Sequence, residues 1–188
     1  MKLSRYCLLL ISIVLITACG NDDKTEPPAE LTEFEQTHYL TLEWSASTDY
    51  IIGEQYLFIE PLLLKDRIVT AGRNGTLNAY DLEDGDELAE IKLKTPLSGG
   101  IGGTEEIWLV GSRDGELIAV SSRNNDILWR TRVPSEILAK PVVYNNNIAL
   151  VRTADGQILG VDIKTGKINW NYSKTIPALT LRGSSPVI

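Results

Sequence analysis

The sequence predicts an all-β fold, a β-propeller of four-stranded blades, and three observations support this prediction. A pattern of fifteen residues begins at Gly75, Gly115 and Gly156, and its intervals of 40 and 41 residues are typical of propeller blades. Turn signals divide each repeat into four short segments. The segments 107–110 and 148–151 are apolar without a break, so both faces of their sheets must be covered. Blades packed face to face around an axis meet that requirement.

The second repeat shows the expected strands most clearly. Its turn signals separate strands at 97–101, 106–111, 116–121 and 126–133. Asn-Gly and Asp-Gly pairs supply the positive φ angles that tight hairpins need. Counted in this way, complete blades cover about 51–94, 96–134 and 137–174, and a fourth begins near Pro177. Small residues recur four positions after each starting glycine, where strands crowd together, and we expect them to be packing residues: Ala79, Ala119 and Gly160.

Tryptophan follows the same period. Trp129 and Trp170 end the second and third copies of the pattern, whereas Ala89 stands at that position in the first. Trp44 lies 45 residues before Ala89, in an expected strand at 39–45 that would complete the last blade and close the ring. A large planar side chain at a repeated strand position favours a plug between adjacent blades. Next to Ala89, the contact between the blades is then either less tightly plugged, or another side chain fills the space of the missing tryptophan.

The first eighteen residues have the layout of a secretory signal. Lys2 and Arg5 precede an apolar run at 6–16, which is too short to span a bilayer comfortably. The order Ile-Thr-Ala before Cys19 resembles the bacterial lipobox, which implies that Cys19 is acylated and becomes the first mature residue. Gly20 follows it in place of the aspartate that signals retention in the inner membrane. We therefore expect a lipid anchor in the outer membrane; the alternative is an incidental cysteine after an uncleaved anchor.

Residues 19–38 form an expected lipidated tether, and residues 39–188 the propeller domain. The tether is polar, acidic and interrupted by Pro27-Pro28. No Cys, Asp or Glu stands at metal-ligand spacing from its His38, so we expect a solvated linker residue. Losing the signal removes Lys2 and Arg5 and moves the net charge from −7 to −9. A chain this acidic is a poor match for nucleic acid. With Cys7 in the signal and Cys19 lipidated, neither a disulfide nor a thiolate metal site is expected.

Three blades and parts of two others do not close a ring, because propellers use four to eight blades. The sequence stops at Ile188, inside what looks like a first strand of the fourth blade. We interpret the chain as an N-terminal fragment or a truncated gene product. The alternative is an open array whose exposed edges would tend to aggregate.

The pattern Gly-x-Leu-x-Ala-x-Asp-x-x-x-Gly-x-x-x-Trp resembles the PQQ-like propeller repeat over residues 39–188, with departures at Ala89, Ser121 and Asn125. With the lipobox and the acidic tether, the whole chain resembles the N-terminal half of the BamB family, eight-bladed lipoproteins of the outer-membrane β-barrel assembly machinery. The stretch 176–187, Ile-Pro-Ala-Leu-Thr-Leu-Arg-Gly-Ser-Ser-Pro-Val, carries the closest likeness.

That resemblance implies a non-enzymatic scaffold without a cofactor or a small-molecule substrate, which binds the periplasmic POTRA domains of BamA and assists insertion of outer-membrane proteins. The family's contact residues fall on Leu179, Leu181 and Arg182. The two leucines share one face of an extended segment, and an arginine beside apolar anchors is typical of binding hot spots. The alternative is that both leucines are core residues of the fourth blade and that Arg182 forms an intramolecular pair.

Two other functions remain open from the sequence. True quinoprotein dehydrogenases share the repeat, but many need adjacent cysteines, and Asp81 and Asp162 stand where a turn role is the better explanation. No nucleophile elbow or phosphate-binding loop occurs, and the run Gly99–Gly103 leads into a strand rather than a helix, so a bend near the start of the blade is expected. The third reading is a generic periplasmic lipoprotein of PQQ-like repeats that binds another protein or a cell-wall component.

Overall fold

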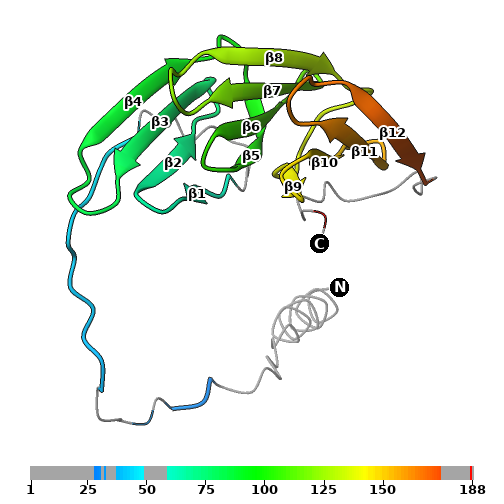
Figure 1. The fold of residues 1–188 in the computed structure, drawn as a ribbon. Coiled ribbons are helices and arrows are strands. Elements are labelled where there is room, and N and C mark those ends of the chain that lie inside the picture. The colour runs from blue at the N-terminus through cyan, green and yellow to red at the C-terminus, as the bar shows by residue number, and fades with distance from the viewer. Residues whose placement is uncertain (1–27, 31, 33–36, 49–58, 175–186, 188) are drawn as a thin grey trace, which may run out of the picture. The chain divides into compact units, whose positions relative to one another are not determined.

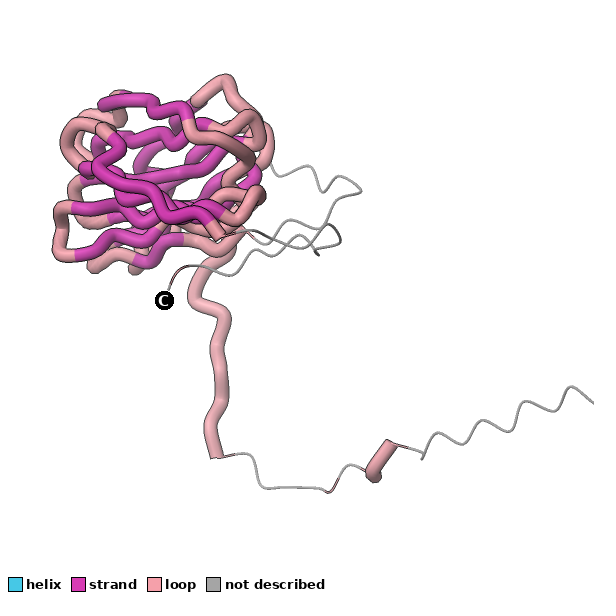
Figure 2. The backbone as a smooth tube through the Cα atoms, turned by 90° about the vertical axis from the view of Figure 1, so that its right-hand side faces the viewer, coloured by secondary structure: helices cyan, strands magenta, loops and turns pink. Residues whose placement is uncertain are grey.

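The structure is a computed structural model that describes residues 28–30, 32, 37–48, 59–174 and 187. The chain divides into two compact units, Met1–Leu40 and Thr41–Ile188, and the second unit contains every strand. In the described part of the chain all regular structure is β-strand (Figure 2). The predicted all-β class is therefore confirmed.

Twelve strands form three four-stranded antiparallel sheets that follow one another in chain order (Figure 1). The first sheet contains β1 (Leu62–Leu63), β2 (Arg67–Ala71), β3 (Thr76–Asp81) and β4 (Glu87–Lys92). The second contains β5 (Leu97–Gly103), β6 (Ile107–Ser112), β7 (Glu116–Ser121) and β8 (Ile127–Arg132). The third contains β9 (Val142–Tyr144), β10 (Ile148–Arg152), β11 (Gln157–Asp162) and β12 (Ile168–Ser173). Each sheet is one predicted blade, numbered 1 to 3 below.

The core consists of two apolar clusters, one on each face of blade 2. Along β7, Ile118 and Val120 belong to the cluster shared with blade 1, whereas Leu117 and Ala119 belong to the cluster shared with blade 3. All four side chains are 0% exposed. This alternation explains the unbroken apolar runs of the sequence, because a strand covered on both faces has no wet side.

The glycine run before blade 2 differs from its expected bend. Gly99–Gly103 lies in the innermost strand, β5, which runs to Gly103 instead of ending at residue 101, with a register shift between Leu97 and Ile101. The segment leading to blade 3 approaches this strand closely, so that a Cβ at Gly102 would lie 1.8 Å from the carbonyl oxygen of Pro141. The glycines are therefore needed for backbone contact between neighbouring blades.

Two of the predicted tryptophan plugs, Trp44 and Trp129, are described together with the turns that they contact. Each packs on the blade that follows it in the chain. Trp129 of β8 donates a hydrogen bond from Nε1 to the carbonyl oxygen of Ile163, at 2.9 Å, in the β11–β12 turn of blade 3. A Cβ at Gly166, in the same turn, would lie 2.6 Å from the Trp129 indole. Trp44 repeats this arrangement on blade 1, with a 3.0 Å bond to the Leu82 oxygen and Gly85 beneath the ring. The expected strand at 39–45 is wrong, however, because residues 37–48 contain no strand and Trp44 makes this contact from an irregular segment. The predicted plug between blades is confirmed.

The junction between blades 1 and 2 lacks this plug. Ala89 replaces the tryptophan, and the turn position that is Gly85 in blade 1 and Gly166 in blade 3 is Asn125 here, with φ 62°. Ala89 instead packs against the buried cluster that contains Trp108. Arg130 adds a polar contact, donating from Nη2 to the Leu93 oxygen at 2.8 Å.

The small residues of the repeat lie at crowded positions, as expected. Ala79 and Ala119 are buried opposite Ala89 and Trp129 on the outer strands. Gly160 lies opposite Trp170, and a Cβ there would be 2.1 Å from that indole. Directly after each of these pairs the outer strand shifts register, which leaves Leu88, Leu128 and Asn169 as extra residues.

Candidate binding pocket

The site residues expected from the sequence lie outside the described residues. This holds for Cys19, the expected lipidation site, and for Leu179, Leu181 and Arg182, the expected partner contacts. His38 is described and exposed, as expected for a tether residue. The candidate site built from described side chains is a different one.

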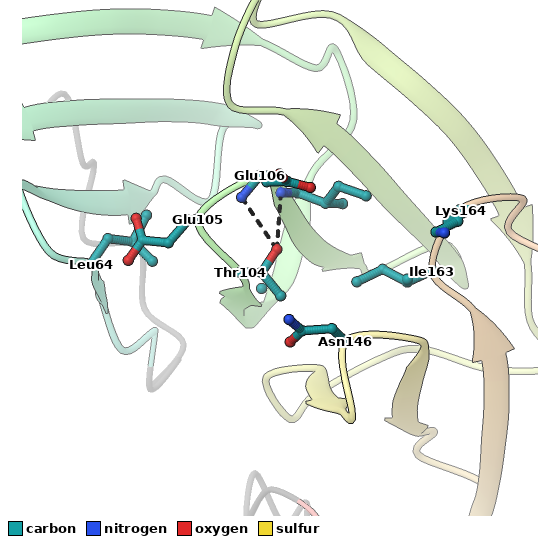
Figure 3. A pocket seen from close by; sticks show the side chains of 9 residues that line it. Leu64, Thr104, Glu105, Glu106, Asn146, Ile163 and Lys164 are labelled. Atoms are coloured by element: carbon teal, nitrogen blue, oxygen red, sulfur yellow. Dashed lines mark hydrogen bonds between the residues drawn. The ribbon is translucent and has the colours of Figure 1, made fainter.

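A pocket of about 500 Å³ opens where loops of all three blades meet (Figure 3). The β1–β2 loop contributes Leu64, the β5–β6 loop contributes Thr104 and Glu105, and blade 3 contributes Asn146, Ile163 and Lys164. In Figure 3, Leu64 and Glu105 lie on one side of the pocket and Ile163 and Lys164 on the other, with Thr104 and Asn146 between them. These residues span a hundred positions of sequence, so only the packing of the blades brings them together.

Thr104 organises the β5–β6 loop. Its backbone N–H donates to the Ile107 oxygen at 2.8 Å, which closes the turn. Its hydroxyl oxygen accepts the backbone N–H groups of Glu106 at 3.3 Å and Ile107 at 3.2 Å. Threonine is favoured in such turns because the hydroxyl replaces a missing backbone partner. The loop therefore presents Glu105 at a fixed place.

Asn146 belongs to a tight turn between β9 and β10. Asn145 and Asn146 both adopt left-handed backbone conformations, with φ of 49° and 51°, and Asn147 donates its N–H to the Tyr144 oxygen at 3.2 Å. Asparagine tolerates this region better than other residues that have a Cβ. The run of three asparagines, a turn signal in the sequence, thus places an amide at the pocket.

Ile163 forms a rigid wall because both of its backbone groups are bonded. Its N–H donates to the Asn147 oxygen at 2.9 Å, and its carbonyl oxygen accepts the Trp129 indole. The side chain is 2% exposed and belongs to the cluster between blades 2 and 3. The tryptophan plug therefore also fixes one side of the pocket.

Salt bridges involve one charged residue of the pocket lining and one pair of the neighbouring β1–β2 loop. Glu106 forms a salt bridge with Arg123 at 3.0 Å, and Asp66 forms one with Arg67 at 2.7 Å. The Arg67 hydrogen bond lowers the pKa of Asp66, and the same bond raises the pKa of Arg67. Glu105 accepts the Lys65 N–H at 3.2 Å but forms no salt bridge with any described residue. The pocket therefore has one carboxylate whose charge is only weakly compensated.

The carboxylates of the repeat have the predicted turn role. Asp81 accepts the Glu83 N–H at 2.8 Å, and Asp162 accepts the N–H groups of Lys164 and Thr165 at 3.1 and 2.8 Å. Hydrogen bonds from Thr165 lower the pKa of Asp162. Among the described residues no group of three histidine, cysteine, aspartate or glutamate side chains is arranged to hold a metal ion. In the same part of the chain, no helix is long and apolar enough to cross a membrane.

Sequence reasoning did not predict the pocket. Threonine at 104 and asparagine at 145–147 are typical turn residues, but nothing local indicates that their loops converge. One signal was present: both turns occupy the same place in their repeats, between the first two strands of a blade. Equivalent loops of successive blades lie on one face of a propeller, so their shared repeat position predicts proximity.

The chain matches the family model described as outer membrane protein assembly factor BamB over residues 73–188. A relative of that name from Burkholderia pseudomallei is 30% identical over 93% of this chain and 45% of its own length. One from Nitrosomonas eutropha is 34% identical over 95% of this chain and 46% of its own length.

Among solved structures, BamB from Moraxella catarrhalis is similar with a TM-score of 0.57 and 26% identity, over 62% of this chain and 35% of that one. The chain spans about half the length of the curated relatives it matches. The repeat, the blades and the family match agree, and the chain belongs to the family of outer membrane protein assembly factor BamB.

Proposed function

We propose that this chain acts as a non-enzymatic scaffold in the outer-membrane β-barrel assembly complex, where it binds the POTRA domains of BamA. The observation that carries this proposal is the family match over residues 73–188, made with relatives named as outer membrane protein assembly factors. The described side chains are consistent with a scaffold, because the repeated aspartates serve as turn acceptors rather than forming a reactive cluster.

The proposed contact residues are Leu179, Leu181 and Arg182, which follow blade 3 in the sequence. Residues two apart in an extended segment point to the same side, so the two leucines can enter one apolar groove of the partner. Arg182 can then donate a charge-assisted hydrogen bond at the edge of that groove. Interfaces concentrate their binding energy in such arginine and apolar anchors.

The proposed attachment is a lipid on Cys19, after removal of residues 1–18 as a signal. Residues 19–38 would then tether the propeller domain to the periplasmic side of the outer membrane. Triacylation supports firm anchoring, since a single acyl chain holds a protein only weakly. The lipobox order of Ile16, Thr17 and Ala18 before Cys19 supports this part of the proposal.

The test is Arg182→Glu in the full-length protein, assayed by capture of purified BamA POTRA domains. Capture is expected to fall by about tenfold or more, because reversing a charge at a hot spot removes a bond and adds repulsion. Arg132→Glu on the exposed end of β8 is the matched control and should leave capture unchanged. Circular dichroism should be the same for both variants. Unaltered capture by Arg182→Glu would reject the assigned contact.

A further inference from the structure

We propose that the pocket between the three blades binds a short extended peptide that carries an apolar side chain with a basic residue beside it. The proposal goes beyond the scaffold role, which requires no ligand at this place. It rests on the size of the pocket, its apolar walls, its open hydrogen-bonding groups and its charge distribution.

The size and the walls suit a few residues of peptide. A volume of about 500 Å³ lies within the range of pockets that hold small ligands. Three apolar side chains line it, one from each blade: Leu64, Ile107 and Ile163. Leu64 and Ile107 are half-buried, so a ligand side chain placed between them would remove more apolar surface from water.

The polar groups match a peptide backbone. Asn146 offers both an amide donor and a carbonyl acceptor, and no described residue bonds to that side chain. A peptide group needs that same pair of partners. The Thr104 hydroxyl accepts two backbone N–H groups, and its own hydrogen remains to be donated to a ligand carbonyl. Figure 3 shows Asn146 and Thr104 next to each other in the middle of the pocket, with the Thr104 hydroxyl oxygen turned toward the backbone nitrogens of Glu106 and Ile107.

Charge selects the ligand. Glu105 has no salt bridge within the described residues, and Arg67 acts on it only at longer range. Its carboxylate is therefore available to a lysine or arginine of the ligand. The net charge of −7 adds a field that attracts basic peptides and repels acidic ones. Lys164, on the opposite side, fixes the orientation by favouring the carbonyl end or an acidic group there.

The pocket is ready to bind without rearrangement. The Trp129 hydrogen bond holds Ile163, and the two hydrogen bonds to Thr104 hold the β5–β6 loop. A preformed site loses little conformational entropy on binding, which preserves the affinity of a small ligand. The bound backbone would meet groups that are already in place.

Fluorescence anisotropy with a labelled, capped peptide Ser-Lys-Leu-Thr-Ser tests the proposal on the full chain in detergent micelles. Its counterpart Ser-Glu-Leu-Thr-Ser should bind about three- to tenfold more weakly, because Glu105 repels its carboxylate. Glu105→Lys should reverse that preference. The proposal is overturned if the two peptides bind equally well or if neither of them binds.

A matched pair of variants locates the peptide. Asn146→Gly removes the pocket amide while keeping the left-handed backbone, and should weaken binding of the basic peptide about two- to tenfold. Asn145→Gly makes the same change at the neighbouring turn position and should leave binding unaltered. An equal effect of both variants, or no effect of Asn146→Gly, would show that the peptide binds elsewhere. Glu105→Lys leaves the β9–β10 turn unchanged, so its effect on peptide preference does not depend on how the two asparagine variants affect that turn.

Discussion

Single side chains of the repeat act mainly on their own turns, which is why the sequence revealed them. Asp81 accepts the backbone N–H two residues ahead, and Asp162 accepts those two and three residues ahead. Ser121 departs from the aspartate of the pattern but keeps the role, because its hydroxyl accepts the Arg123 N–H at 3.3 Å. Such bonds depend on local geometry alone, so residue type and position suffice to predict them.

Asp162 gives a prediction about acid stability. Its pKa is lowered in the folded state, first by the Thr165 side chain, so its carboxylate favours folding above the unfolded pKa. That contribution is lost as the pH falls through the folded pKa, below about pH 4. Asp162→Asn should therefore lose less thermal stability than the parent between pH 6 and pH 3, measured by circular dichroism.

The exposed loop variant Asp114→Asn serves as the comparison for this pH series. It should show the acid dependence of the parent protein. If Asp162→Asn also follows the parent curve, the turn bonds of Asp162 do not contribute to acid sensitivity.

At the scale of strands and blades, the sequence predicted the tryptophan plugs but not the turns that receive them. The period placed both tryptophans on outer strands, which holds for Trp129 in β8 but not for Trp44, whose segment contains no strand. The turns that receive Trp44 and Trp129 lie 38 and 34 residues further along the chain. Alanine at 89 and asparagine at 125 depend on each other: a tryptophan at 89 would require glycine at 125, because a Cβ beneath an indole would clash. Only the packing of neighbouring blades connects these two positions.

This pairing predicts coupling between two substitutions. Ala89→Trp alone should destabilise the protein, because Asn125 occupies the place that glycine leaves open beneath Trp44 and Trp129. Asn125→Gly alone should change stability by less than about 0.5 kcal/mol. The double variant should recover at least about 1 kcal/mol relative to the sum of the single effects, measured by urea unfolding.

The reverse change at the junction of blades 2 and 3 is the control. Gly166→Asn introduces beneath Trp129 the residue that blade 2 tolerates beside Ala89, and should cost about 1–3 kcal/mol through overpacking. If the effects of Ala89→Trp and Asn125→Gly on the free energy of unfolding are strictly additive, the two side chains do not share one packing site.

At the scale of the whole molecule, the number and order of blades followed from the repeat, but the pocket did not. The glycine intervals and turn signals gave three blades with nearly correct strand limits. Two expectations were wrong: β5 runs two residues further than expected, and residues 37–48 contain no strand where one was expected at 39–45. The pocket depends on how Leu64, Thr104, Asn146 and Ile163 come together, which is a property of blade packing. The pattern of residues within single strands does not indicate which loops come together.

The covered position of blade 2 predicts an order of hydrogen exchange. Its strands β6 and β7 contribute side chains to both apolar clusters, whereas the inner strands of blades 1 and 3 contribute to one each. The amides of β6 and β7 should therefore exchange more slowly than those of β2–β3 and β10–β11, measured by mass spectrometry. Equal rates in the three blades would show that the described clusters do not set local stability.

The register shift on every outer strand has a consequence for how such a molecule can grow. An extra residue at Leu88, Leu128 and Asn169 bends the free edge of each blade and interrupts its row of unpaired backbone groups. A straight foreign strand therefore meets a broken template at that edge. Because the shift lies within the repeat, every duplication of a blade copies this protection against aggregation together with the fold.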